Sequence, residues 1–281
     1  MHKIKYKIST YIKNFLLYSF LIILAIIMIA PFIWMISTSL KETGAIFTLP
    51  PEIIPSNISL NNYKEIFERI PFLNFTKNSI IITISASIGQ VVSCSLAAYA
   101  FARMKFKGSK VLYYILLSTM MIPSQVTIIP TFIIMNKLGL VDTHLALILP
   151  ACLGGAFGTF LLRQFFSSIP KDLEDAAKID GCGSLRIFYH IFLIQSKPVL
   201  ATLFIFAFMF YWNDLLSPVI FLSSLDKMTL TVGLASIQGI NYDRFDLMMA
   251  GSFLSMIPIL ILFVFAQKFF IKSIVSTGLK E

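Results

Sequence analysis

Six long runs of apolar residues, separated by shorter polar segments, dominate the chain. They cover residues 15–40, 79–102, 111–135, 143–162, 198–222 and 248–267. A helix needs about 20 predominantly apolar residues to cross the ~30 Å hydrocarbon core of a membrane, and each run is long enough. The pattern therefore predicts an all-α integral membrane protein with six transmembrane helices.

Prolines and polar residues interrupt the third run. It contains Pro123 and Pro130, with Ser124, Gln125 and Thr127 between them. Proline removes a backbone donor and breaks or kinks a helix. Two interpretations stay open: the interruption faces a water-filled path through the protein, or it is a pair of kinks packed against neighbouring helices.

The fifth run contains Asp214, the only Asp, Glu, Lys or Arg within the six runs. A carboxylate inside a membrane is costly and marks a candidate functional site. As part of one continuous helix, Asp214 is expected roughly 24 Å from the start of the run, near the outer interface, where a charge costs less. Solute contact and a structural hydrogen-bonding role both fit. Gln125, Asn213 and Asp214 are the candidate residues of a substrate path.

The connection between the first two runs, residues 41–78, is the longest. Three prolines, at positions 50, 51 and 55, predict an extended segment, and the alternation over residues 62–67 predicts an amphipathic helix on the outer face. An interfacial helix is the preferred interpretation. A docking surface for an extracellular partner is the alternative.

The distribution of charge fixes the predicted topology. The chain has 281 residues, of which 57% are hydrophobic and 13% charged, and its net charge is +9. Sixteen Lys and Arg residues lie in the N-terminal tail, the second and fourth connections and the C-terminal tail, against seven in the other connections. The positive-inside rule then places both termini and the connection that contains Asp175-Ala176-Ala177 in the cytoplasm. The apolar runs are expected to lie in membrane lipid. The basic excess reflects topology, so we expect no nucleic-acid partner. The first run is too long for a signal peptide and is interpreted as a retained helix.

Several kinds of chemistry find no support in the sequence. The three cysteines and three histidines are scattered without metal-ligand or disulfide spacing. No phosphate-binding loop of the Gly-x-x-x-x-Gly-Lys-Ser/Thr type is present, so we expect ATP to bind elsewhere. The apolar runs contain no paired catalytic groups, which argues against an intramembrane enzyme. A secondary transporter driven by an ion gradient would need ionisable groups in several of its spans, whereas Asp214 is the only Asp, Glu, Lys or Arg present, which argues against this class of transporter.

The fourth connection has the pattern of a short surface helix. Pro170 suits a first helical turn, acidic residues follow it, and Gly181 suits a left-handed end. Helical spacing predicts one shared face of small residues, a knob that suits a groove in another protein. That face consists of Leu173, Ala176, Ala177 and Asp180.

This connection, about residues 168–186, resembles the coupling loop of ATP-binding-cassette importer permeases. The family pattern is Glu-Ala-Ala, two residues, then Asp-Gly, and this chain has Asp175-Ala176-Ala177 followed by Asp180-Gly181, with Glu174 beside the altered position. The likeness extends to Ala97-Ala98-Tyr99-Ala100-Phe101-Ala102-Arg103, Met121-Ile122-Pro123 and Trp212-Asn213-Asp214. It is greatest to the second permease of the maltose and multiple-sugar group.

The resemblance implies a type I importer permease fold with a cytoplasmic coupling helix. It divides the chain into an N-terminal part (1–74), a core (75–270) and a cytoplasmic tail (271–281). It further implies a transport subunit, rather than an enzyme, that moves a sugar or oligosaccharide across the bacterial cytoplasmic membrane. An ion-coupled secondary transporter of a small polar solute is the alternative.

The implied partners are a second permease subunit, two ATPase subunits that hold ATP and Mg, and an extracellular or periplasmic sugar-binding protein. The chain itself is expected to bind no cofactor. The contacts with the ATPase are expected at Glu174, Asp175, Ala176, Ala177, Asp180 and Gly181.

Overall fold

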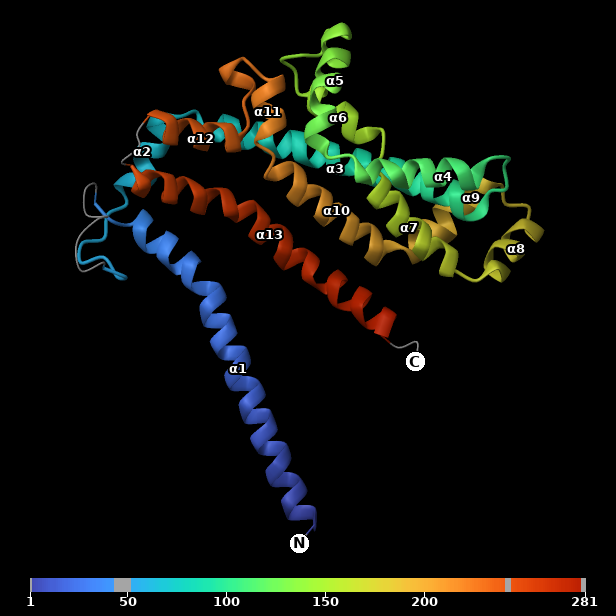
Figure 1. The fold of residues 1–281 in the computed structure, drawn as a ribbon, viewed down its shortest axis with the longest axis horizontal. Helices are drawn as coiled ribbons and strands as arrows, with labels where there is room; N and C mark the ends of the chain where they lie inside the picture. Colours follow the sequence, from blue (N-terminus) through green and yellow to red (C-terminus); the bar gives the residue numbers. More distant parts are fainter. Residues whose placement is uncertain (1, 43–51, 241–243, 279–281) are drawn as a thin grey trace. The chain divides into compact units, whose positions relative to one another are not determined.

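The computed structural model describes residues 2–42, 52–240 and 244–278, and every regular element in these ranges is helical (Figure 1). The elements, in chain order, are α1 (His2–Ser39), α2 (Asn61–Arg69), α3 (Phe72–Arg103), α4 (Ser109–Ser118), the 3-10 helix η1 (Thr119–Met121), α5 (Ser124–Lys137), α6 (Leu145–Cys152), α7 (Ala156–Ser168), α8 (Lys171–Ile179), α9 (Ser184–Ile187), the π-helix η2 (Phe188–Leu193), α10 (Lys197–Trp212), α11 (Leu216–Phe221), the 3-10 helix η3 (Leu225–Lys227), α12 (Leu230–Ile240) and α13 (Phe245–Gly278).

The helices form two compact units. The first comprises Met1–Ile70 with Ser236–Leu254, and the second Pro71–Ala235 with Ser255–Glu281. The division into residues 1–74, 75–270 and 271–281 stays a prediction, and residues 279–281 of the predicted tail lie outside the described ranges.

Four helical stretches are long and apolar enough to span a membrane: Tyr11–Ser39, Phe72–Arg103, Leu145–Ser168 and Phe245–Gln267. Two bent helix pairs pass the same test, with bends of 106° and 83°, so the described residues provide four to six spans. The all-helical fold class is confirmed, and the count of six stays a prediction.

The third apolar run breaks at the first of its two prolines. The 3-10 turn η1 ends at Met121, α5 begins at Ser124, and the two arms are bent by 106°. Pro123 precedes the first residue of α5, where its missing donor costs nothing. Pro130 lies inside α5.

The single helix expected over residues 198–222 is wrong. Helix α10 ends at Trp212 and α11 starts only at Leu216. The Asn213 amide donates to the carbonyl of Met209 at 2.7 Å, and Asp214 accepts the backbone N–H of Ser217 at 3.1 Å. Asn and Asp side chains compete with helical hydrogen bonds in this way, which accounts for the break.

Helix α3 is the axis of the second unit and packs along α6, α7 and α10 (Figure 1). Small residues permit the close approach. A Cβ added at Gly158 of α7 would lie 2.8 Å from the sulfur of Cys94 on α3 and 3.0 Å from Leu203 on α10. Such contacts are typical of helix packing in membranes, where backbones approach through glycine.

In the first unit, α2 confirms the amphipathic helix predicted around residues 62–67. Asn62 and Ile66 are buried, and the Asn62 amide donates to the backbone carbonyls of Ser39 and Lys41. Arg244 makes a bidentate pair with Glu65, with N–O distances of 2.8 and 2.6 Å. These bonds fasten α2 to the residues that follow α1 and precede α13.

The Glu65–Arg244 pair should stabilise the first unit in a pH-dependent way. Arg244 lowers the pKa of Glu65 from 4.5 to about 2, so the contribution is present above pH 4.5 and is lost as the pH falls towards 2. We expect Glu65→Gln to lower the free energy of unfolding of the purified protein by about 1–3 kcal/mol at neutral pH. Thermal melts across pH should show the variant and wild type converging in acid.

Glu68→Gln is the matched control, because Glu68 lies on the same helix in an exposed pair with Lys64 at 4.0 Å. Such pairs contribute about 0–1 kcal/mol. Equal melting of Glu65→Gln and wild type at neutral pH would contradict the stabilising role of Arg244.

Candidate functional site

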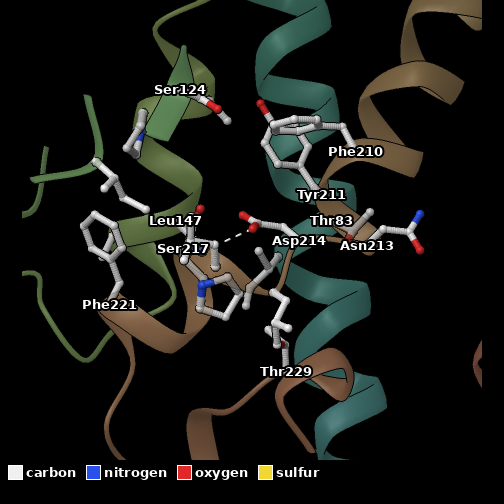
Figure 2. A pocket seen from close by; sticks show the side chains of 18 of the residues that line it. Thr83, Ser124, Leu147, Phe210, Tyr211, Asn213, Asp214, Ser217, Phe221 and Thr229 are labelled. Atoms are coloured by element: carbon white, nitrogen blue, oxygen red, sulfur yellow. Dashed lines mark hydrogen bonds between the residues drawn. The ribbon is translucent and has the colours of Figure 1, made fainter. Parts of the chain in front are cut away.

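The second unit contains a cavity of about 900 Å³. Its walls come from α3, α5, α6, the end of α10 and α11 (Figure 2). A volume of this size is typical of small-molecule sites. Hydroxyl and amide side chains supply much of its polar lining: Ser79, Thr83, Ser124, Gln125, Thr127, Thr131, Asn213, Ser217 and Thr229.

The cavity brings together the three residues predicted for a substrate path. Gln125, Asn213 and Asp214 all line it, although they come from two separate apolar runs. Figure 2 shows the Asp214 carboxylate directed towards Ser217, whereas the Asn213 amide points the other way. The structural hydrogen-bonding role considered for Asp214 is confirmed by its bond to the Ser217 N–H. Its role towards a solute stays a prediction.

The break at Pro123 also belongs to this cavity. Ser124, Gln125 and Thr127 follow the proline directly and line the same space. Of the two interpretations of the broken helix, the geometry favours the one in which the break faces an open space, to which Ser124, Gln125 and Thr127 present polar groups.

Sequence reasoning missed several hydroxyl groups on α3, α10 and α12 in and beside the cavity wall. Ser79 accepts the N–H of Leu230 at 2.8 Å, and Thr231 donates to the carbonyl of Asp214 at 2.8 Å. The Tyr211 hydroxyl donates to Gln90 at 3.1 Å. Single Ser and Thr residues are ordinary in apolar helices, so the sequence carried no signal for them.

A second missed feature fixes the segment between α11 and α12. Asp142, with a φ of 61°, accepts the backbone N–H groups of Ser223 and Ser224, both at 2.9 Å. It also pairs with Lys227 at 2.9 Å. These donors hold the pKa of Asp142 well below its ordinary range, the Ser224 bonds being the largest cause. These bonds of Asp142 hold the loop that joins two parts of the cavity wall, Phe221 and Thr229.

The short helix predicted in the fourth connection is confirmed as α8, with Pro170 immediately before its first residue. Asp172 and Glu174 lie in the first turn, where the helix dipole favours acids. Gly181 has a φ of +74°, so the predicted left-handed end is confirmed. The N–H of Cys182 bonds to the carbonyl of Ala177 at 2.9 Å and that of Gly181 to Lys178 at 3.0 Å, which is the Schellman pattern.

Helix α8 divides the small-residue face that was predicted for it. Leu173, Ala176 and Asp180 are exposed, whereas Ala177 is half-buried and packs against the aromatic core of its own chain. The two neighbouring acids also separate: Asp175 is exposed and Glu174 is buried. Lys178 bonds to Glu174 at 2.7 Å, and this bond raises the pKa of Lys178.

Within the described residues, no group of three or more His, Cys, Asp or Glu side chains is placed to hold a metal ion. The two candidate sites are the cavity and the exposed side of α8.

The family model that matches residues 89–276 is that of the binding-protein-dependent transport system inner membrane components. This range contains α8 and most of the cavity wall. The chain belongs to this family. Its members are permeases, so the predicted family membership and the importer permease fold are confirmed.

Two relatives and one solved structure agree with this assignment. The chain is 36% identical to the arabinooligosaccharides transport system permease protein AraQ of Halalkalibacterium halodurans, over 87% of this chain and 86% of the relative. It is 35% identical to the melibiose/raffinose/stachyose import permease protein MelC of Bacillus subtilis, over 89% and 91%. A bacterial ABC transporter involved in the import of the acidic polysaccharide alginate superposes with a TM-score of 0.80 at 25% identity, over 93% of this chain and 98% of that chain.

The left-handed end of α8 can be tested without steric interference. A Cβ added at Gly181 meets nothing within 4 Å, so Gly181→Ala probes the backbone alone. A non-glycine residue in the left-handed region costs about 1–2 kcal/mol. We expect hydrogen exchange of the α8 amides to accelerate at least about fivefold in the variant.

Gly183→Ala is the control, because Gly183 lies in the same connection and in equally open space but has an ordinary φ of −71°. Its exchange rates should match wild type. Equal rates in all three proteins would show that the left-handed residue does not hold the end of α8.

Proposed function

We propose that this chain is a permease subunit of an ATP-binding-cassette importer that moves a sugar or oligosaccharide across the cytoplasmic membrane. The observation that carries the proposal is a cavity at helix breaks, lined by hydroxyl and amide side chains among apolar ones and lying mostly within the range of the family model. The relatives AraQ and MelC are named as permeases for arabinooligosaccharides and for melibiose, raffinose and stachyose, which points to saccharides.

The chemistry of the cavity suits a saccharide. Sugar hydroxyls need many donors and acceptors, and the lining offers hydroxyl and amide groups on several sides. The rings of Phe210 and Tyr211 supply apolar surface for the C–H faces of a sugar.

The charge of the lining favours an uncharged saccharide. Among the described residues that line the cavity, Asp214 is the only acid, and none is Lys, Arg or His. An anionic sugar would meet a like charge without a cationic partner, which is costly away from water. This chain is therefore proposed to differ in cargo from the structurally similar alginate importer, whose polysaccharide is acidic.

Partner subunits supply the energy and the delivery of cargo in this proposal. Two ATPase subunits bind ATP and Mg and dock on the exposed side of α8, with Asp175, Ala176 and Asp180 as contacts. Glu174 and Ala177 hold that helix against its own chain, and Gly181 ends it. A second permease completes the path, an extracellular or periplasmic binding protein delivers the sugar, and both termini of this chain face the cytoplasm.

The test is uptake by the assembled complex in proteoliposomes, with raffinose and an arabinooligosaccharide as probes. Uptake should require ATP on the α8 side and persist when ionophores collapse all ion gradients. Uptake driven by an ion gradient without ATP would favour the alternative, a secondary transporter, for which Asp214 is the only Asp, Glu, Lys or Arg in the predicted apolar runs.

Asp214→Asn should weaken uptake of the neutral probe while leaving assembly intact. The amide oxygen can still accept the N–H of Ser217, but a bond to a charged acceptor is lost from the cavity. We expect an increase in the half-saturating sugar concentration of about fivefold to tenfold, as for ~1–1.5 kcal/mol. Asp226→Asn, an exposed acid on η3, should leave it unchanged. Wild-type uptake by Asp214→Asn would remove Asp214 from the path.

Ala176→Leu should weaken retention of the ATPase subunit on pull-down. A groove shaped for alanine is overpacked by leucine, at a cost of about 1–3 kcal/mol. Ala177→Leu is the contrasting variant, because Ala177 packs against the core of its own chain. We expect Ala177→Leu to lower the thermal stability of the permease, whereas Ala176→Leu should not. Full retention of the ATPase by Ala176→Leu would contradict docking on this side of α8.

A further inference from the structure

The side chain of Arg103, the last residue of α3, is buried although it is a cation at the end of an apolar helix. Its side chain is only 5% exposed. It belongs to the second unit, as do all the groups that it contacts. Its environment is therefore built within this chain and does not depend on a partner subunit.

The guanidinium binds the end of α7. Its Nη2 donates to the carbonyl of Phe166 at 2.6 Å and also to the carbonyl of Ile169. The last carbonyls of a helix lack intrahelical donors, and a cation there is favoured by the helix dipole. Arg103 therefore joins the end of α3 to the end of α7.

The same group reaches α8 and η2. Its Nη1 lies 3.8 Å from Oε2 of Glu174, whose side chain is only 10% exposed, and its Cζ lies 5.0 Å from the ring centre of Phe192. One guanidinium thus contacts α7, α8 and the π-helix η2 that leads into α10. A planar fork of donors makes this possible, and the single ammonium of a lysine does not reproduce it.

Helix α8 has few other attachments to its own chain. Of its nine residues, only Glu174 and Ala177 are not exposed. Ala177 contributes one methyl group to the aromatic core. The charge contact of Glu174 with Arg103 is therefore one of two side-chain contacts, with the packing of Ala177, that hold the less exposed side of α8 against its own chain.

We propose that Arg103 is a positioning residue which, through Glu174, clamps α8 to the ends of α3, α7 and η2, so that displacement of α8 moves the cavity-lining helices with it. This inference rests on the proposed importer function. With the clamp intact, a load on the exposed side of α8 is transmitted to the spans. Without the clamp, α8 pivots on its two connecting segments, and its displacement no longer moves the cavity-lining helices.

The experiment measures ATP hydrolysed per sugar imported by the complete complex in proteoliposomes, with raffinose as the probe. Variants are Glu174→Gln, Arg103→Lys, Arg103→Gln and the Arg103→Gln/Glu174→Gln double variant. We expect each complex to assemble and hydrolyse ATP, with the ratio rising about fivefold or more, the scale of coupling changes caused by single substitutions. The double variant should be no worse than Arg103→Gln, because both changes remove one contact.

Lys105→Gln is the matched control, because this exposed cation lies two residues beyond Arg103 and should leave the ratio unchanged. A wild-type ratio in Glu174→Gln and Arg103→Gln would overturn the clamp. So would loss of assembly in every variant, Arg103→Lys included, because the pair would then serve folding alone. ATP-dependent uptake by the wild-type complex tests the importer function separately, so failure of the clamp leaves that result untouched.

Discussion

Within a membrane, a backbone N–H or C=O group that has no helical hydrogen bond needs a partner inside the protein. This constraint explains where the membrane helices of the chain are interrupted. Three breaks, at Pro123, at Gly154-Gly155 and at Asn213–Leu215, all border the cavity described above. Each is supported locally: the sulfur of Cys94 lies 3.2 Å from the N–H of Gly155, and Asp214 accepts the N–H of Ser217. The cavity is thus the place where the released backbone groups and their side-chain partners are concentrated. This is the space in which we propose that the solute path lies.

Helix α3 connects the cavity to the neighbourhood of α8 within the second unit. Thr83 of α3 lines the cavity, and Arg103 ends α3 beside α8. Twenty residues separate them, which corresponds to about 30 Å of helix. No break interrupts α3 over this length, whereas the helices around it are bent or divided. An unbroken helix with a firm attachment at its end is a suitable element for carrying displacement over such a distance.

The sequence predicted the features that depend on local chemistry. Apolar runs indicated the spans, Pro123 the break, and Gly181 the left-handed end of α8. It did not predict which features meet in space. Arg103 and Glu174 are 71 positions apart, and nothing in either segment marks them as partners. The break at Asp214 was missed because the apolar run continues across it, and hydropathy does not register the competition of Asn and Asp side chains for backbone donors.

Helix phase explains why the two adjacent acids of α8 differ. Successive residues turn by about 100°, so Glu174 and Ala177 point to the chain's own core while Ala176 and Ile179 lie on the far side. The motif residues are therefore split between an anchoring side and an exposed side of one short helix. This division separates their tasks. Under the proposed function, a change on the exposed side is expected to alter what α8 binds, whereas a change at Glu174 is expected to alter what α8 moves. Asp175, at the position where the coupling-loop resemblance expects glutamate, lies on the exposed side, so its shorter side chain bears on the proposed docking and not on the contact between Glu174 and Arg103.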